Sequence, residues 1–341
     1  MMIDLRSDTV TRPTPSMRTA MDRAEVGDDV FGEDPTVLRL EEGLAERFGH
    51  EAGLFCPSGT MTNQIAINVH TRPGDEVICE EGAHIYRYEG GGLMANSGCS
   101  VRFIPSDRGR FTAEQVEAAI GNPNDVHQAR TRLVNIENTS NRGGGSTWDL
   151  QEVIGIREVC ERHGLALHLD GARIFNAMAV TGESPKDWGA TFTSMSICLS
   201  KGLGAPIGSV LIGPRDFIHQ ARRVRKRFGG GMRQVGTIAA AGLFALEHHV
   251  DRLVEDHARA KALEAALVTC GWVTGVLPVQ TNIVVASLAS SEMVDRALAA
   301  LKVEGVLAVR FGPQQIRMVT HLDVDDAAIQ RTITILQRLR P

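Results

Sequence analysis

Short apolar segments alternate with segments of helical periodicity between residues 52 and 213 of this 341-residue chain. Segments such as 52–56 and 165–170 are short and bounded by turn residues, which is typical of buried strands. Connections that run strand, helix, strand place successive strands parallel to one another. The pattern therefore predicts an α/β domain with a mostly parallel sheet flanked by helices.

The order of elements changes after about residue 250. The periodicity there predicts strands and helices in the following order: strand 282–287, helix 291–304, strand 306–310, strand 316–320 and helix 325–339. This order is typical of a compact α+β module. We therefore predict a surface arm at residues 1–15, a large α/β domain at 16–250 and a small C-terminal α+β domain at 251–341.

Composition and charge exclude several classes of protein. The formal net charge of −5 gives no basic footprint for nucleic acid. The first residues lack an apolar signal core and no run approaches a membrane span, so we expect a cytoplasmic protein that does not bind membranes. The six cysteines form no C-x-x-C pair. The sequence thus predicts neither a disulfide framework nor a metal site.

Lys201 follows the apolar run 195–199, and a segment rich in glycine and proline comes directly after it. The run alternates, so we expect Met195, Ile197, Leu199 and Lys201 to share one face of a strand. Apolar surroundings disfavour an ammonium group, so we expect a lowered pKa and a nucleophilic amine. The alternative is a strand-end lysine that reaches out to water.

Three other segments supply groups that pyridoxal 5′-phosphate (PLP) needs from a protein. Asp170 ends a predicted strand, where a carboxylate could keep the pyridine nitrogen protonated. Gly59 and Thr60 begin a helix after a strand, so their N–H groups could bind the phosphate. His84 follows another strand end and could lie against the ring. Each feature alone has an ordinary explanation, but together with Lys201 they predict a PLP site.

Two arginines are candidates for binding the carboxylate of an amino acid. Arg173 follows Asp170 closely, and Arg317 lies within a predicted strand. An arginine inside a strand is costly unless it is paired or faces a cleft. Guanidinium groups bind carboxylates in a bidentate manner, so both side chains are predicted to hold the substrate carboxylate.

Eight motifs resemble those of the low-specificity L-threonine aldolases, nearly from end to end. They are Leu5–Thr11, Val26–Pro35, Pro57–Asn63, His84–Glu89, His168–Asn176, Leu199–Pro206, Gly229–Gln234 and Arg317–Asp323. The resemblance implies the aspartate-aminotransferase type of fold (fold type I), with a sheet of about seven strands. It also implies reversible cleavage of L-threonine, L-allo-threonine and related β-hydroxy-α-amino acids to glycine and an aldehyde. The assembly it implies is a homotetramer built from two dimers, with active sites shared between the subunits of each dimer.

The resemblance also assigns roles to residues. Those it implies as catalytic are Lys201, which bonds to PLP, Asp170, His84 and His127. Those it implies for the cofactor are Gly59, Thr60, His84, Asp170, Arg173, Ser200, Lys201 and, from the neighbouring subunit, Arg233. Those it implies for the substrate are Ser7, His84, Tyr88, His127, Arg173 and Arg317. The base acting on the β-hydroxyl is His84 or His127, directly or through water.

One departure and several alternatives stay open. Ser140 stands where the family often has histidine, which leaves the substrate preference undecided. β-Elimination or transamination could run on the same fold, and a PLP-holding protein without turnover is a further alternative. A nicotinamide enzyme would need a G-x-G-x-x-G turn after the first strand, and residues 57–62 do not supply one.

Overall fold

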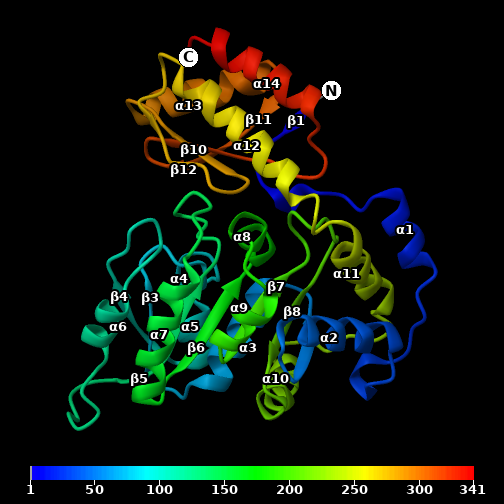
Figure 1. Ribbon diagram of the computed structural model, residues 1–341, viewed down its shortest axis with the longest axis vertical. Helices are drawn as coiled ribbons and strands as arrows, with labels where there is room; N and C mark the ends of the chain where they lie inside the picture. Colours follow the sequence, from blue (N-terminus) through cyan, green and yellow to red (C-terminus); the bar gives the residue numbers. More distant parts are fainter. Residues whose placement is uncertain (1) are drawn as a thin grey trace.

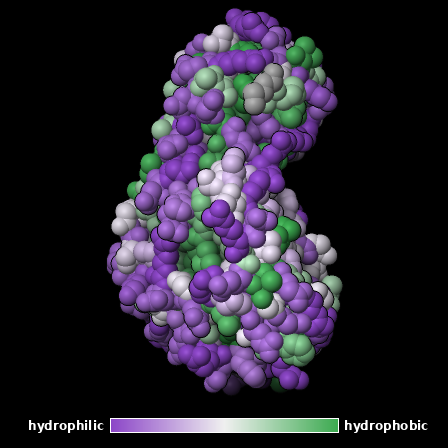
Figure 2. Space-filling view, turned by 90° about the vertical axis from the view of Figure 1, so that its right-hand side faces the viewer, coloured by the Kyte–Doolittle hydropathy of each residue, from purple (hydrophilic) through white to green (hydrophobic). Residues whose placement is uncertain are grey.

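The computed structural model describes residues 2–341 and has two lobes joined at a narrower waist (Figures 1 and 2). The larger lobe contains a seven-stranded sheet in the order β2-β8-β7-β6-β5-β3-β4. Its strands are β2 (Ala52–Cys56), β3 (Asp75–Glu80), β4 (Ser100–Ile104), β5 (Arg130–Glu137), β6 (Ala166–Gly171), β7 (Ser194–Cys198) and β8 (Ser209–Gly213). Strands β3 to β7 pair in parallel, and β8 is antiparallel to β7 and β2. The predicted α/β fold with a mostly parallel sheet is confirmed.

Helices cover both faces of this sheet (Figure 1). They are α1 (Pro15–Asp22), α2 (Pro35–Phe48), α3 (Gly59–His70), α4 (His84–Arg87), α5 (Gly92–Ser97), α6 (Ala113–Ala119), α7 (Leu150–His163), α8 (Ile174–Thr181), α9 (Pro185–Thr191), α10 (Arg215–Arg227) and α11 (Gly236–His248). Alternate residues of β2 show the two faces. Leu54 contributes to an apolar core with α3 and α10, whereas Phe55 contributes to the main core with α2 and α9.

The helix boundaries follow from the capping residues in the sequence. The Asp34 side chain accepts hydrogen bonds from the first turn of α2, Pro35 takes the first helical position, and Gly49 ends the helix with a φ of 74°. Asp149 and Gly164 delimit α7 in the same way. These are the boundaries that the sequence predicts for both helices.

The smaller lobe has its own sheet, in the order β12-β13-β10-β9, and its own apolar core. Its elements are α12 (Leu253–Val268), β9 (Gly275–Val276), β10 (Ile283–Ser287), α13 (Ser291–Val303), β11 (Val306–Leu307), β12 (Val309–Gly312), β13 (Gln315–Val319) and α14 (Asp326–Arg338). Leu253 still belongs to the core of the larger lobe, whereas Ala260, on the same helix, belongs to the core of the smaller lobe. We propose a domain boundary there, close to the predicted residue 250.

Parts of the N-terminal arm are buried, although its polar sequence indicates a surface segment. Strand β1 (Ile3–Asp4) pairs in parallel with β11, so the first residues belong to the smaller lobe. Leu5 and Asp8 are fully buried. The arm then returns to the larger lobe, where Thr11 donates a hydrogen bond to the backbone carbonyl of Lys201 at 3.0 Å. Long-range partners hold this polar segment against both lobes, and local sequence does not reveal them.

Two further expectations from composition can be compared with the structure. All six cysteines are free and buried. Among residues 2–341, no helix combines the length and the apolar character needed to cross a membrane.

Two helical glycines predict opposite effects of alanine. A Cβ at Gly189 would lie 1.7 Å from the carbonyl oxygen of Phe48, whereas a Cβ at Gly43 meets nothing within 4 Å. We expect Gly189→Ala to lower the free energy of unfolding by about 1–3 kcal/mol because α2 and α9 must separate. The control Gly43→Ala should raise it by about 0.5–1 kcal/mol. Urea unfolding measures both, and equal effects would contradict the close α2–α9 contact.

Candidate active site

A cavity of about 310 Å³ opens between the two lobes. Six residues with predicted roles line it: Ser7, His84, Tyr88, Arg173, Lys201 and Arg317. The remaining lining residues are Thr9, Glu137, Asn141, Arg142, Ala172, Val309, Arg310 and Phe311. The arm, the sheet edge of the larger lobe and strands β12 and β13 of the smaller lobe therefore meet at one site.

Parallel strands bring the carboxylates of this site together. In the register of β5 and β6, Glu137 is the partner of Asp170, and Asp170 is in turn the partner of Ser196 on β7. Carboxyl ends of parallel strands share one edge of a sheet, which is where ligands bind in open α/β folds. Asp170 and Lys201 come to the same edge, as predicted from the order of their strands.

Lys201 does not lie on the strand that precedes it. Strand β7 ends at Cys198, and the next residues form a turn in which the Gly204 amide donates to the Lys201 carbonyl at 2.8 Å. The shared strand face predicted for Met195 and Lys201 is therefore wrong at the lysine, because the turn redirects the chain. The turn aims the amine at Cys198, and Nζ donates to its Sγ at 3.1 Å.

The expected lowering of the Lys201 pKa is also wrong. Burial lowers this pKa, and so does the charge of Arg173. The charges of Cys198, Asp170 and Asp8 favour the ammonium form and outweigh these effects, so the net result is a raised pKa. The sequence argument considered only the apolar strand. It did not include anionic groups that tertiary contacts bring near the amine.

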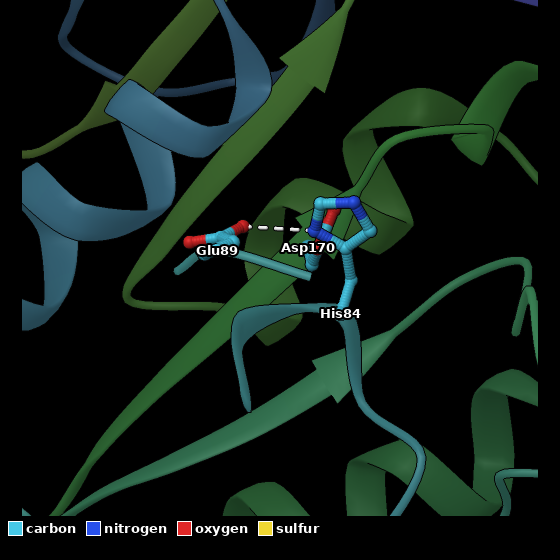
Figure 3. A group of neighbouring side chains, drawn as sticks. All are labelled: His84, Glu89 and Asp170. Carbon is cyan, nitrogen blue, oxygen red and sulfur yellow. Dashed lines mark hydrogen bonds and ion pairs between the residues drawn. The ribbon is translucent and has the colours of Figure 1, made fainter. Parts of the chain in front are cut away.

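His84, Glu89 and Asp170 form a compact cluster (Figure 3), and Asn63 bonds to two of its members. The amide of Asn63 donates to Glu89 Oε1 and to Asp170 Oδ2, both at 2.8 Å. His84 Nδ1 lies 2.9 Å from Glu89 Oε1. Burial lowers the pKa of His84, but the hydrogen bond to Glu89 and the charges of Asp170 and Glu137 outweigh this, so the pKa is raised.

This cluster also has the composition of a metal site, since one ligand atom of each of His84, Glu89 and Asp170 falls within 4.8 Å of the others. The donor set is already used, however. Glu89 accepts from Asn63 and Gln64 and pairs with His84. Hydrogen bonds satisfy these carboxylates without a cation, so we interpret the cluster as support for a cofactor ring.

The start of α3 provides an anion-binding geometry. Gly59 and Thr60 are its first residues, and their N–H groups have no intrahelical acceptors. A Cβ at Gly59 would lie 2.5 Å from Cys198 Sγ and 3.5 Å from Ser209 Oγ, so only glycine fits there. The hydroxyl of Ser209 is buried and makes no hydrogen bond within the described residues. The site therefore offers donors that await an acceptor, beside the cysteine that Lys201 contacts.

Arg173 is held by a residue of the N-terminal arm. Its Nε and Nη2 donate to Asp8 at 2.7 and 2.6 Å, and both side chains are almost fully buried. The Asn282 amide donates to the same carboxylate at 3.1 Å. Burial raises the pKa of Asp8, but Arg173 outweighs it and holds the pKa at about 2. The bidentate face predicted for a substrate carboxylate is therefore occupied by Asp8.

Arg317 is the more available of the two predicted arginines. Its Nη1 donates to Asn141 Oδ1 at 2.8 Å and its Nη2 to the Arg6 carbonyl at 3.1 Å. Its Nε is buried and has no partner among the described residues. Burial and the charge of Arg173 lower the pKa of Arg317 to about 10. A free donor on a buried guanidinium indicates that an anion is missing from its surroundings.

Two predicted residues lie on the exposed surface of this chain, away from the cavity. The His127 side chain is 88% exposed on the loop before β5, where it contacts Asp125. Arg233 is 59% exposed on its side chain and pairs with Asp28 at 2.8 Å. Ser200 and Thr60 are half-buried near Lys201 and at the start of α3, and neither lines the cavity.

Sequence reasoning missed Glu137 and Arg142, which both line the cavity. Burial and the charge of Asp170 raise the pKa of Glu137 to about 7, although the Asn141 amide, the charge of His84 and the His84 amide oppose this. Its position after a parallel strand could have revealed Glu137. The guanidinium carbon of Arg142 lies 4.5 Å from the centroid of the Phe311 ring, and Arg142 donates to the Phe311 carbonyl. No local sequence pattern predicts this contact.

Comparisons with known proteins agree with this geometry. The family described as beta-eliminating lyase matches residues 4–291. A low specificity L-threonine aldolase of Escherichia coli K12 is 43% identical over 327 residues, covering 95% of each chain. A probable low-specificity L-threonine aldolase of Arabidopsis thaliana is 41% identical and covers 99% of this chain and 97% of its own.

The chain belongs to the threonine aldolase family. Solved structures agree on the fold. A threonine aldolase of Leishmania major, 24% identical, superposes with a TM-score of 0.84 and covers 98% of this chain and 99% of its own. A serine palmitoyltransferase of Sphingomonas wittichii, 16% identical, has a TM-score of 0.78 and covers 98% and 86%. The predicted family and fold type are both confirmed.

The Asp8–Arg173 pair predicts a pH-dependent loss of stability in this threonine aldolase family member. Asp8→Asn leaves Arg173 buried without its anion, which should lower the free energy of unfolding by about 3–5 kcal/mol near neutral pH. The pKa of Asp8 falls on folding from its ordinary value of 3.8 to about 2. Its ionised form therefore stabilises the fold above about pH 4, and this part is lost as the pH falls toward 2.

The difference in stability between the wild type and Asp8→Asn should therefore shrink by about 2 kcal/mol between pH 5 and pH 2. Denaturant unfolding at several pH values measures this difference. Asp22→Asn, at an exposed position, is the control and should change little at either pH. A difference that does not vary with pH would contradict the pairing of Asp8 in the folded protein.

Proposed function

We propose that this protein is a PLP-dependent aldolase that cleaves L-threonine and related β-hydroxy-α-amino acids to glycine and an aldehyde. Family membership gives the reaction class, and the observation that carries the assignment is the site itself. One sheet edge brings Lys201, Asp170 and the start of α3 together beside His84 and Arg317. No feature of the site favours β-elimination or transamination over this reaction.

The residues present fit PLP. Lys201 would bond to its aldehyde carbon, Asp170 would face the ring nitrogen, and His84 would lie along the ring. Gly59 and Thr60 would bind the phosphate, with Ser200 near them as the sequence predicts. The unpartnered Ser209 hydroxyl and the space that only a glycine leaves support a phosphate at this helix start. When bound, PLP supplies an electron-accepting ring for the bond that breaks.

His84 is the better candidate for the group that takes the proton from the substrate hydroxyl. Glu89 engages Nδ1 of His84, which leaves Nε2 for the substrate, and the ring lines the cavity. Glu137 lies beside it with a pKa near 7, so it can hold or release a proton near neutral pH. His127 lies on an exposed loop of this chain, so its predicted role requires another subunit to bring it to the site.

The substrate carboxylate would bind chiefly to Arg317. Its Nε is buried without a partner among the described residues, and Arg317 and Ser7 line the same cavity. Arg173 would contribute its positive charge, while its Nε and Nη2 atoms stay bonded to Asp8. Orienting the substrate through its carboxylate selects which bond at Cα can align with the ring. Tyr88, whose ring centroid lies 5.5 Å from that of His84, would border the aldehyde half of the substrate.

Product analysis tests the proposed reaction. With added PLP and L-threonine, the purified protein should release glycine and acetaldehyde in equal amounts. Lys201→Ala should lower the rate about a thousandfold or more and remove the visible absorption of lysine-bound PLP. Lys302→Ala, at an exposed position on α13, is the control and should keep both. Ammonia and a keto acid as the products would instead establish the alternative reaction.

We infer further that active sites are shared between subunits of a cytoplasmic homotetramer. A cavity of about 690 Å³ lies over α10 and the loop 29–32, away from the site described above. Phe31 is 73% exposed there, and Val26 and Val30 are also exposed, which favours a protein partner. Arg233 pairs with Asp28 in the adjoining loop. A second copy seated on this surface would receive Arg233, as the resemblance implies.

Mixed oligomers test the sharing of sites. Lys201→Ala and Arg233→Ala should each be nearly inactive alone, whereas their co-expression should restore about one quarter of the wild-type activity. Half of the randomly formed dimers are mixed, and each of these has one intact site. Lys201→Ala with Asp170→Asn is the control pair, because both residues belong to one chain's site and cannot complement. Inactivity of the first mixture at the wild-type oligomeric state would argue against a shared site.

A further inference from the structure

A continuous series of buried hydrogen bonds runs behind Asp170, on the side away from the cavity. It begins at Asn63, whose Nδ2 donates to Asp170 and to Glu89, both at 2.8 Å. Asn63 Oδ1 lies 3.2 Å from Nε2 of His168. One amide group therefore uses both of its hydrogens on two carboxylates and its oxygen on an imidazole.

The series continues from His168 to the far end of α3. Nδ1 of His168 lies 2.8 Å from the Ser194 hydroxyl, and Nε2 of His70 lies 2.8 Å from the same hydroxyl. Asn63, His168 and Ser194 are at most 1% exposed. His168 and Ser194 are partners in the register of β6 and β7. Asn63 and His70 are seven residues apart, so two turns of α3 place them on the same face of the helix.

The direction of each hydrogen bond follows from the first. Because the Asn63 amide hydrogens point to carboxylates, its oxygen must accept, and His168 must carry its proton on Nε2. Nδ1 of His168 lies 2.8 Å from the Ser194 hydroxyl and 3.1 Å from the Ser194 backbone carbonyl. With the proton on Nε2, Nδ1 accepts from the hydroxyl, which is the nearer of the two, and that hydroxyl accepts from Nε2 of His70. This requires two neutral histidines. Burial lowers the pKa of His168 to about 3, and burial lowers that of His70 to about 4, so both are neutral near pH 7.

We propose that His168, Ser194 and His70 form a positioning relay that fixes the orientation of the Asn63 amide and thereby holds the Asp170 carboxylate toward the ring nitrogen of PLP. The inference rests on the proposed function. If the amide turned over, its oxygen would face two carboxylates, which is unfavourable for all three groups. The proton on Nε2 of His168 opposes that rotation. The donor held in this way fixes the position of the Asp170 carboxylate.

The relay also explains a polar interior where an apolar one would be expected. Helix α3 packs against the sheet, yet its side chains toward β6 and β7 include the polar Asn63 and His70. These two side chains contact His168 of β6 and Ser194 of β7. Buried polar groups specify one arrangement when every donor and acceptor is satisfied. Each of the bonding atoms named above has a partner, so the series works as a unit.

A cofactor analogue separates this role from a merely structural one. Asn63→Leu should weaken PLP binding to the cofactor-stripped protein about tenfold to hundredfold. The same variant should bind 1-deazapyridoxal 5′-phosphate, in which a CH group replaces the ring nitrogen, within about twofold of the wild-type affinity. Damage to the pocket would weaken both ligands alike. Asn68→Leu is the control, because Asn68 lies on the same helix and bonds to Asn96 and Ser97 outside the site.

A second pair of variants tests the link through His168. His168→Leu removes the donor to Asn63 and should weaken PLP binding selectively, as Asn63→Leu does. His168→Gln keeps an N–H donor and should restore most of the affinity, although it equally removes the imidazole. If Asn63→Leu does not fold, Ser194→Ala removes one hydroxyl of the relay and should show the same selectivity to a smaller extent.

The outcomes are distinguishable. Equal weakening of PLP and its deaza analogue, or no weakening of either, would overturn the relay while leaving the proposed function intact. Equal affinities of His168→Gln and His168→Leu would overturn the part assigned to His168. Failure of the unmodified protein to bind PLP would overturn the proposed function, and the relay inference with it.

Discussion

Buried carboxylates at the edge of the main sheet are the constraint on which this site depends. The parallel register of β5 and β6 places Glu137 beside Asp170, and Glu89 lies within reach of the same amide. Ionised groups in an interior are costly unless charges or hydrogen bonds compensate them. Hydrogen bonds from surrounding residues compensate these carboxylates. Asn63 donates to two of the carboxylates, and the Asn141 and His84 amides donate to the third.

The same constraint separates the carboxylates by function. The pKa of Glu137 rises to about 7 because it is buried next to Asp170. Asp170 accepts hydrogen bonds from the Asn63 side chain and the Ala172 backbone N–H, which hold its carboxylate in place. Two acids at one sheet edge thus receive different environments. Glu137 can exchange a proton near neutral pH, whereas Asp170 has a carboxylate of fixed orientation.

The N-terminal arm joins the lobes around this charged edge. Asp8 bonds to Arg173 of the larger lobe and to Asn282 of the smaller lobe, while β1 adds to β11. The cavity lies where these contacts converge, with Arg317 on its far wall. Binding of an amino acid at Arg317 would therefore depend on how the lobes and the arm are held together. A site built this way is complete only when residues far apart in sequence have met.

Local patterns in the chain predict the α/β class and the helix caps that the structure has, because each depends on neighbours a few residues away. The same patterns are the basis for proposing Lys201, Asp170 and the start of α3 as a cofactor site. They could not reveal that the Asp8 carboxylate binds the Arg173 guanidinium, that anions raise the pKa of Lys201, or that Glu137 and Arg142 line the cavity. Those features arise from contacts between segments far apart in sequence, such as Asp8 with Arg173, 165 residues apart, and Arg142 with Phe311, 169 residues apart. Periodicity and capping record a residue's neighbours along the chain, whereas charge pairing and burial depend on which distant segments the folded sheet brings together.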